Sequence, residues 1–62
     1  MNITVKTEVA LADVTLTFIN SDRMPITQQT GINCETTFTG INESFRIDTN
    51  DRIVSTITEI FD

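Results

Sequence analysis

The sequence predicts an all-β domain, built as a small antiparallel meander of about five strands in an open sheet or a partly open barrel. Twelve of the 62 residues are Thr and nine are Ile, and both types have branched side chains that favour strands over helices. They alternate with Val, Leu and Phe, so apolar side chains tend to recur at every second position. This is the pattern of strands with one buried face. We expect a single domain over residues 1–62.

The first two strands are expected at residues 2–9 and 14–19. In each strand, alternate side chains are predicted to face a core: Ile3, Val5, Thr7, Val9, Val14, Leu16 and Phe18. Residues 10–13 between them are short enough for a hairpin, so the two strands are expected to pair. A helical turn over residues 8–13 is the alternative, and it would shorten both strands.

Residues 20–31 interrupt the alternating pattern. The segment from Asn20 onward has the composition of a turn, and the only proline, Pro25, keeps Met24 out of the helical conformation. We expect an exposed loop that ends at Gly31. A loop of about twelve residues is long for a small domain, which marks it as a candidate functional segment.

The tetrapeptide Thr-Gly-Ile-Asn occurs at residues 30–33 and again at 39–42. A period of about nine residues is found in β-solenoids, but two copies are too few for such an array. Each glycine is predicted to lie in a turn, where its freedom at positive φ is useful. The second turn would join a strand at 32–38 to a strand at 43–48. Their inward-facing residues are expected to be Ile32, Cys34, Thr36, Phe38, Phe45 and Ile47.

Two interpretations fit residues 50–61. In a helix, five apolar side chains would share an arc of about 120°, which would make the fold a β-rich α+β domain. These side chains are Ile53, Val54, Ile57, Ile60 and Phe61. The high content of Ile, Val and Thr favours a strand instead, and we prefer that interpretation.

A chain of this length forms a marginal core, because it buries only roughly 60% of the surface that its unfolded form exposes. Cys34 is the only cysteine and there is no His, so neither an internal disulfide nor a tetrahedral zinc site is expected. Self-association is the remaining means of stabilisation. We expect a homodimer or a higher oligomer that shares edge strands or an apolar face.

The net charge is −5, of which residues 1–31 contribute −1 and residues 32–62 contribute −4. Direct nucleic-acid binding is disfavoured, because neutralising phosphates requires clustered Lys and Arg. The acidity aids solubility or directs the surface to a basic partner. We expect no signal peptide and no membrane segment. A single thiol fits a reducing compartment, so the expected location is the cytoplasm (the host cytoplasm for a viral protein).

No enzymatic activity is expected. Without His, catalysis near neutral pH falls to Cys34 or to a carboxylate pair, such as Glu43 with Asp48 or Asp51. Cys34 lies on a predicted inward face and is expected to be inert. A calcium loop starting at Asp48 fails, because Ile53 stands where the loop needs Gly. No cofactor, no metal and no catalytic residue is therefore predicted.

The candidate binding residues are the three arginines and two polar residues: Arg23, Arg46, Arg52, Asn20 and Thr37. The forked guanidinium group suits a phosphate or a carboxylate. Thr and Asn side chains offer further hydrogen bonds without reactivity. We expect these residues to contact a ligand or a partner.

The expected function is therefore that of a non-enzymatic binding protein. Its size, acidity and lack of catalytic groups are typical of the small inhibitors that phages carry against host defence proteins or host enzymes. Such a protein would occlude a host protein, or sequester a small anionic, nucleotide-like ligand between subunits. The alternative is a small structural or assembly subunit of a capsid, tail or similar complex, with strands that share exposed edges.

Overall fold

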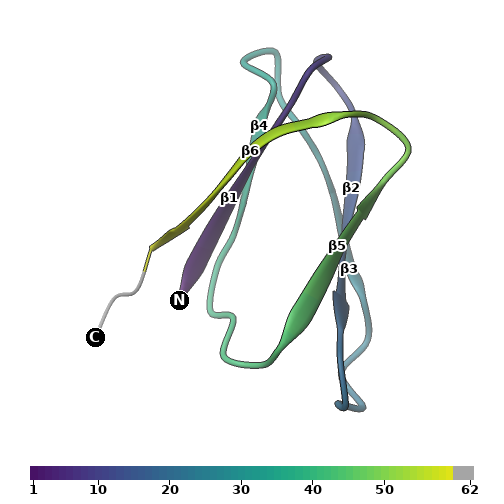
Figure 1. Cartoon of the computed structure of the whole chain (residues 1–62), viewed down its shortest axis with the longest axis vertical. Helices are drawn as coiled ribbons and strands as arrows, with labels where there is room; N and C mark the ends of the chain where they lie inside the picture. Colours follow the sequence, from purple (N-terminus) through teal and green to yellow (C-terminus); the bar gives the residue numbers. More distant parts are fainter. Residues whose placement is uncertain (60–62) are drawn as a thin grey trace.

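Six strands form two three-stranded antiparallel sheets in the computed structural model, which describes residues 1–59 except the side chains of residues 57 and 59. Sheet A has the order β4 (Glu35–Phe38), β1 (Asn2–Thr7), β6 (Ile53–Glu59). Sheet B has the order β3 (Ile26–Gln29), β2 (Asp13–Phe18), β5 (Phe45–Thr49). Figure 1 shows the two sheets side by side. The predicted all-β class is confirmed, and the described residues contain no helix that is long and apolar enough to cross a membrane.

The core lies between the two sheets, and the two central strands supply most of it. Its buried side chains are Ile3, Val5, Val14, Leu16, Phe18, Phe38 and Ile41. Each such side chain contributes about 1.5 to 3 kcal/mol by leaving water. The alternation within β1 and β2 places these residues on one face, as predicted, and leaves Thr4, Thr15 and Thr17 on the outer faces.

The connectivity differs from the predicted meander. β1 and β2 do not pair as a hairpin but lie at the centres of different sheets. Among the described strands, β2 and β3 are the only two that are consecutive in the chain and pair with each other. Every other connection crosses from one sheet to the other. β1 and β2 lie in different sheets because the apolar face of each sheet must be covered by the other sheet. Residues 8–12 are long enough to span the roughly 10 Å between packed sheets.

The expected loop at residues 20–31 contains a strand, so that prediction is wrong in its second half. β3 pairs with β2 in the register Leu16↔Ile26 to Asp13↔Gln29. The hydrophobic pattern does not indicate this strand, because three of its four residues are polar and only Ile26 packs against the core. Pro25 directly precedes β3, a position that suits proline at an edge strand.

Two strand boundaries differ from the expected ones in a way that changes which residues are buried. β1 ends at Thr7, and Val9 is exposed instead of buried. β4 begins at Glu35, so Ile32 and Cys34 precede the strand; Ile32 is 91% exposed, and Cys34 is half-buried with φ 66°. A turn over residues 31–34 replaces the strand there, with the Cys34 N–H donating to the Gly31 carbonyl at 3.0 Å. Gly40, at φ 68°, has the positive φ expected of it, whereas in the turn at residues 31–34 the positive φ is at Cys34 and not at Gly31.

Residues 53–59 are a strand, which excludes the helical alternative for that segment. β6 pairs with β1, from Asn2↔Glu59 to Thr7↔Ile53, and the register shifts between Lys6 and Thr7. The expected apolar positions Ile60 and Phe61 lie outside the described residues.

Candidate interaction site at the three-loop end

Three connections meet at one end of the molecule, at the top of Figure 1. They are residues 8–12 between β1 and β2, residues 30–34 between β3 and β4, and residues 50–52 between β5 and β6. We call this region the three-loop end. Each of these connections crosses from one sheet to the other.

Backbone hydrogen bonds tie the three connections to one another. The Thr7 N–H donates to the Cys34 carbonyl at 2.9 Å, and the Glu8 N–H donates to the Arg52 carbonyl at 2.9 Å. The Thr30 N–H donates to the Ala12 carbonyl at 2.8 Å. Loops that bond to each other in this way lose little entropy when a partner binds, because they are already ordered.

Two buried threonines complete this network. The Thr30 hydroxyl accepts the Ala12 N–H at 2.8 Å and lies 3.3 Å from the Thr7 hydroxyl. The Thr7 hydroxyl donates to the Val9 carbonyl at 2.7 Å. Both side chains are almost fully buried, where an unpaired hydroxyl would be costly. Among the described residues, every buried side-chain polar atom has a hydrogen-bond partner.

The outer surface of the three-loop end carries exposed apolar side chains. Val9, Leu11 and Ile32 lie on the loops, and Ile53 and Val54 begin β6 beside them. Ile32 is 91% exposed and Leu11 is 57% exposed. Among the described residues, Ile19 and Met24 are also exposed, at the opposite end. Single apolar side chains are common on surfaces, whereas several at one end are typical of a contact surface.

Leu11 is also conformationally strained. Its φ is 58°, a left-handed conformation that costs a residue with a Cβ roughly 1 to 2 kcal/mol. Gly or Asn would adopt it more easily, and an exposed leucine has little burial to compensate for the strain. Backbone strain of this kind is concentrated at functional sites.

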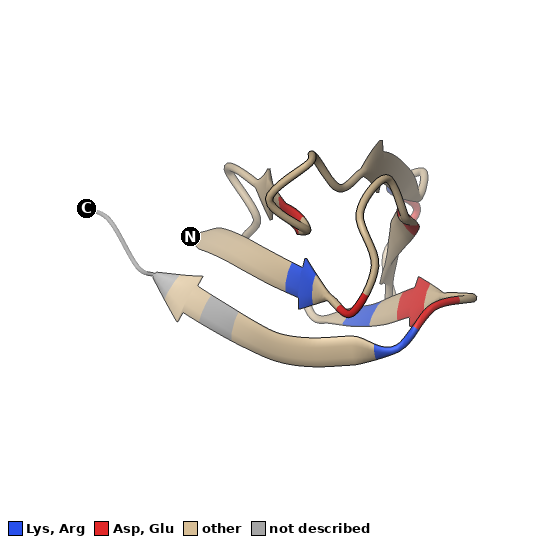
Figure 2. Ribbon diagram, turned by 90° about the horizontal axis from the view of Figure 1, so that it is seen from above, with Lys and Arg blue, Asp and Glu red and all other residues tan. Residues whose placement is uncertain are grey.

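Charged residues also lie at the three-loop end. Glu8 and Asp51 are exposed on two of the loops, beside Arg52. Figure 2 views the molecule from this end and shows acidic and basic residues close to the turns. The net charge of the whole chain is −5.

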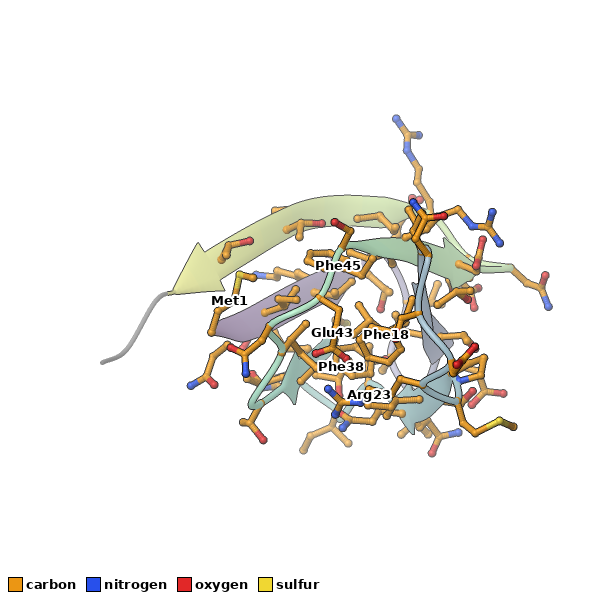
Figure 3. All side chains as sticks on the ribbon, turned by 90° about the horizontal axis from the view of Figure 1, so that it is seen from below. Met1, Phe18, Arg23, Phe38, Glu43 and Phe45 are labelled. Atoms are coloured by element: carbon orange, nitrogen blue, oxygen red, sulfur yellow. The ribbon has the colours of Figure 1, made fainter. Side chains whose placement is uncertain are left out.

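The predicted binding residue Arg23 lies at the opposite end of the molecule and is engaged within the chain. Its guanidinium carbon lies 4.6 Å from the centroid of the Phe18 ring, and its Nη1 lies 3.1 and 3.0 Å from the two carboxylate oxygens of Glu43 (Figure 3). The hydrogen bond from Arg23 lowers the pKa of the Glu43 carboxyl below its ordinary value. This pair joins the β2–β3 connection, which also contains Asn20 at φ 57°, to the β4–β5 connection.

The other predicted binding residues lie on separate surfaces. Arg46 is on the outer face of sheet B, where its Nε lies 3.2 Å from Asp48 Oδ2. Thr37 is on the outer face of sheet A, and its hydroxyl bonds to the Thr4 hydroxyl at 2.9 Å. Arg52 is at the three-loop end. One copy therefore does not gather these residues, and an anionic ligand held between copies stays a prediction.

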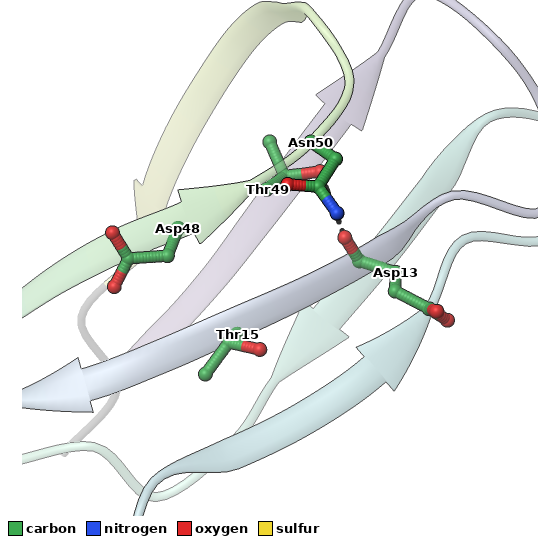
Figure 4. A pocket seen from close by; sticks show the side chains of 5 residues that line it. All are labelled: Asp13, Thr15, Asp48, Thr49 and Asn50. Carbon is green, nitrogen blue, oxygen red and sulfur yellow. Dashed lines mark hydrogen bonds between the residues drawn. The ribbon is translucent and has the colours of Figure 1, made fainter.

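A shallow depression of about 300 Å³ lies at the upper part of sheet B (Figure 4). It is lined by Asp13, Thr15, Asp48, Thr49 and Asn50, and the Thr49 hydroxyl donates to the Asp13 carbonyl at 2.7 Å. Its two carboxylates would repel an anion, and its open, polar lining differs from the enclosed apolar pockets that bind small molecules. The described residues contain no group of three His, Cys, Asp or Glu side chains that could hold a metal.

The carboxylates considered for catalysis also lie apart. Glu43 is bound to Arg23 at one end, Asp48 is bound to Arg46 on the face of sheet B, and Asp51 is in the three-loop end.

Sequence reasoning missed the three-loop end, because it assigned Val9 and Ile32 to the core and treated Leu11 as part of a hairpin linker. One feature of the sequence could have indicated this surface. Leu11 stands among residues of a connection, outside the alternating pattern of either neighbouring strand.

Comparisons with known proteins give no relative: no family model, no curated protein and no solved structure matches this chain.

Proposed function

We propose that this chain is a non-enzymatic binding protein that contacts a partner protein through the three-loop end. The observation that supports the proposal is the strained, exposed Leu11 at the same end of the molecule as the exposed Ile32 and Val9, on loops that are fixed by buried hydrogen bonds. Apolar side chains on a rigid support provide affinity without an ordering cost.

The partner we propose has an apolar recess with basic groups around it. Leu11 and Ile32 would enter the recess, while Glu8 and Asp51 would meet the basic groups. Covering such a recess on an enzyme or a defence protein would block access to it. Blocking a partner in this way is how a small inhibitor acts. If the protein is viral, we expect it to act in the cytoplasm of the host.

Binding of selected peptides tests the proposal without knowledge of the natural partner. A displayed library of random peptides is selected on the immobilised protein, and the contacts of the selected peptides are mapped by NMR chemical-shift changes. We expect the changes to concentrate at residues 8–12 and 30–34, and the peptides to be apolar and basic. Changes concentrated at another surface would overturn the proposal.

Three serine variants sharpen this test. Leu11→Ser and Ile32→Ser remove exposed side chains from the three-loop end, whereas Met24→Ser removes the exposed Met24 from the opposite end. Truncating a central contact residue costs at least about 2 kcal/mol, or roughly thirtyfold in affinity. We expect that loss for L11S and I32S and unchanged affinity for M24S. Equal affinity in all three variants contradicts the proposal.

An assembly subunit is the second candidate, and the unprotected outer edge of β6 favours it. An open assembly grows with concentration, whereas an inhibitor remains a small, defined species. Molar mass measured by sedimentation over a range of concentrations distinguishes the two.

A further inference from the structure

β6 forms one edge of sheet A. Over the described residues it pairs with β1 on one side, and its other side has no neighbouring strand. It is the longest strand among the described residues, with seven residues, and Figure 2 shows it along one side of the molecule. Such an edge exposes a row of backbone donors and acceptors to a second chain.

The register shows which backbone groups are available. The Thr7 N–H bonds to Cys34, so odd-numbered residues of β1 direct their backbone groups to β4. The even-numbered residues of β1 therefore bond to β6, and Lys6 faces Ser55 in that ladder. Because backbone groups alternate along a strand, the N–H and C=O groups of Thr56 and Thr58 point to the open edge.

The other edges have features that oppose pairing with a second chain. β3 follows Pro25, and its Gln28 side chain accepts a hydrogen bond from the Thr36 hydroxyl of β4 at 2.8 Å, which links these two edges. β5 has the exposed charges of Arg46 and Asp48. Charges and prolines are the usual means by which proteins block edge pairing. Residues 53–58 of β6 contain neither.

The inner face of β6 is also uncovered. Thr56 and Thr58 stand opposite Val5 and Ile3, so they face the same side as the core. Val5 and Ile3 are fully buried, yet both threonines are exposed. Val54 is 60% exposed in the same strand. Sheet B therefore covers β1 but leaves β6 open to solvent.

From these observations we infer that two copies of this chain pair through β6, antiparallel, about a twofold axis at Thr56. Thr56 is the central residue of Ile53–Glu59, so a ladder centred there uses the whole strand. It pairs the outward-pointing backbone groups of Thr56 with those of Thr56 of the partner subunit. It places Thr58 opposite Val54 of the partner subunit, where the register between β6 and β1 shifts. The product is a continuous six-stranded sheet, β4-β1-β6-β6-β1-β4.

The charges of the strand favour this second copy as the occupant. Arg52 and Glu59 stand on either side of six uncharged residues. In antiparallel pairing, Arg52 of one copy and Glu59 of the other occupy the same end of the ladder, so each end combines residues of opposite charge in the sequence. Parallel pairing would bring like charges together. Two molecules of net charge −5 also repel each other, and β6 offers an uncharged stretch at which they can approach.

The expected dimer is of moderate affinity. A single pair of strands buries less than the roughly 1,200 to 2,000 Å² of a stable interface, although Val54, Thr56 and Thr58 add side-chain contacts. We expect dissociation in the micromolar range. The inference rests on the edge of β6, whereas the proposed function rests on the loop residues Leu11, Ile32 and Val9. The two surfaces adjoin at Ile53 and Val54, which begin β6.

Sedimentation of the full chain, combined with a matched pair of proline variants, tests the inference. Thr56→Pro removes the outward N–H at the centre of the proposed ladder and leaves the bonds to β1 intact. Thr27→Pro makes the same change on β3, where the Thr30 to Ala12 bond shows that odd-numbered residues point outward. We expect a monomer–dimer equilibrium that T56P weakens at least tenfold and T27P leaves unchanged. A dimer equally affected by both variants overturns the inference.

Amide hydrogen exchange of the unmodified chain provides a test that does not depend on the folding of a variant. The Ser55 N–H bonds to β1 and is protected at every concentration. The Thr56 and Thr58 amides are expected to become protected only as concentration rises through the dimer range. Rapid exchange of both amides in a dimer, a monomer at millimolar concentration, or growth beyond a dimer each overturns the inference.

Discussion

Thr7 and Thr30, 23 residues apart in the sequence, bring their hydroxyl oxygens within 3.3 Å of each other inside the three-loop end. Thr7 ends the central strand of sheet A, and Thr30 follows the edge strand of sheet B. The contact therefore joins the two sheets by polar groups at the point where their apolar core ends. It also fixes the loops that hold Val9 and Leu11.

Thr30→Val is expected to destabilise the protein by about 1 to 3 kcal/mol, because the buried Ala12 N–H loses its acceptor and valine cannot replace it. Valine has nearly the same shape, so the loss reports the hydrogen bond and not a cavity. Urea unfolding followed by circular dichroism measures the change. Thr27→Val is the control, since the hydroxyl of Thr27 bonds to that of Thr15 on an exposed face. Equal losses in the two variants would show that the buried network has no special role.

Leu11→Asn is expected to stabilise the free protein by about 0.5 to 1 kcal/mol, because asparagine adopts a positive φ with less strain. The same change removes an apolar side chain from the three-loop end, so affinity for a selected peptide should fall while stability rises. Thermal unfolding and calorimetric titration measure the two effects. Val9→Asn is the control, because Val9 is exposed on the same loop without a positive φ. It should weaken binding without stabilising the fold.

The sequence predicts the buried residues of a strand correctly where one face of the strand packs against the opposite sheet. In β1 and β2, alternation alone identifies Ile3, Val5, Val14 and Leu16 as buried, because every second side chain faces the opposite sheet. It does not predict which strands pair, since β1 and β2 have the same pattern whether they form a hairpin or face each other across a core.

The candidate site was less predictable for a related reason. In the sequence, Ile32 fits the alternation of inward-facing residues in β4. In the structure it lies in the turn at residues 31–34, before the strand begins. Gln28 and its neighbours show the converse case, in which a polar segment becomes an edge strand through backbone pairing with β2. Both outcomes depend on contacts between distant residues, which a local pattern does not contain.

Glu43→Gln is expected to remove a part of the acid dependence of stability. Arg23 lowers the pKa of the Glu43 carboxyl in the folded protein below its ordinary value of 4.5. The stabilisation that this carboxyl gives to the fold is therefore fully present above its pKa in the unfolded chain. It is lost as the pH falls through its lower pKa in the folded protein. The difference between the native protein and E43Q should be greatest near neutral pH and vanish in strong acid.

Urea midpoints measured from neutral pH to strong acid give this profile. Arg23→Gln should show at least this loss at neutral pH, since it removes the other partner of the pair and also the contact of Arg23 with the Phe18 ring. Glu8→Gln, which removes a carboxyl at the opposite end of the molecule, is the control. A pH-independent difference between the native protein and E43Q would contradict the role of the carboxylate charge.

Two isoleucines in identical tetrapeptides provide the sharpest test of the fold. Ile32 and Ile41 both follow Thr-Gly and precede Asn, yet Ile32 is 91% exposed and Ile41 is fully buried. Ile41→Ala should cost about 2 to 5 kcal/mol through lost burial and the cavity left behind. A domain of this size has only about 3 to 9 kcal/mol of stability, so Ile41→Val, expected to cost about 1 kcal/mol, is the milder companion. Ile32→Ala should change stability by less than about 0.5 kcal/mol. Equal costs for the two alanine variants would mean that both copies of the tetrapeptide are buried alike, and would refute the turn at residues 31–34 together with the apolar surface built on it.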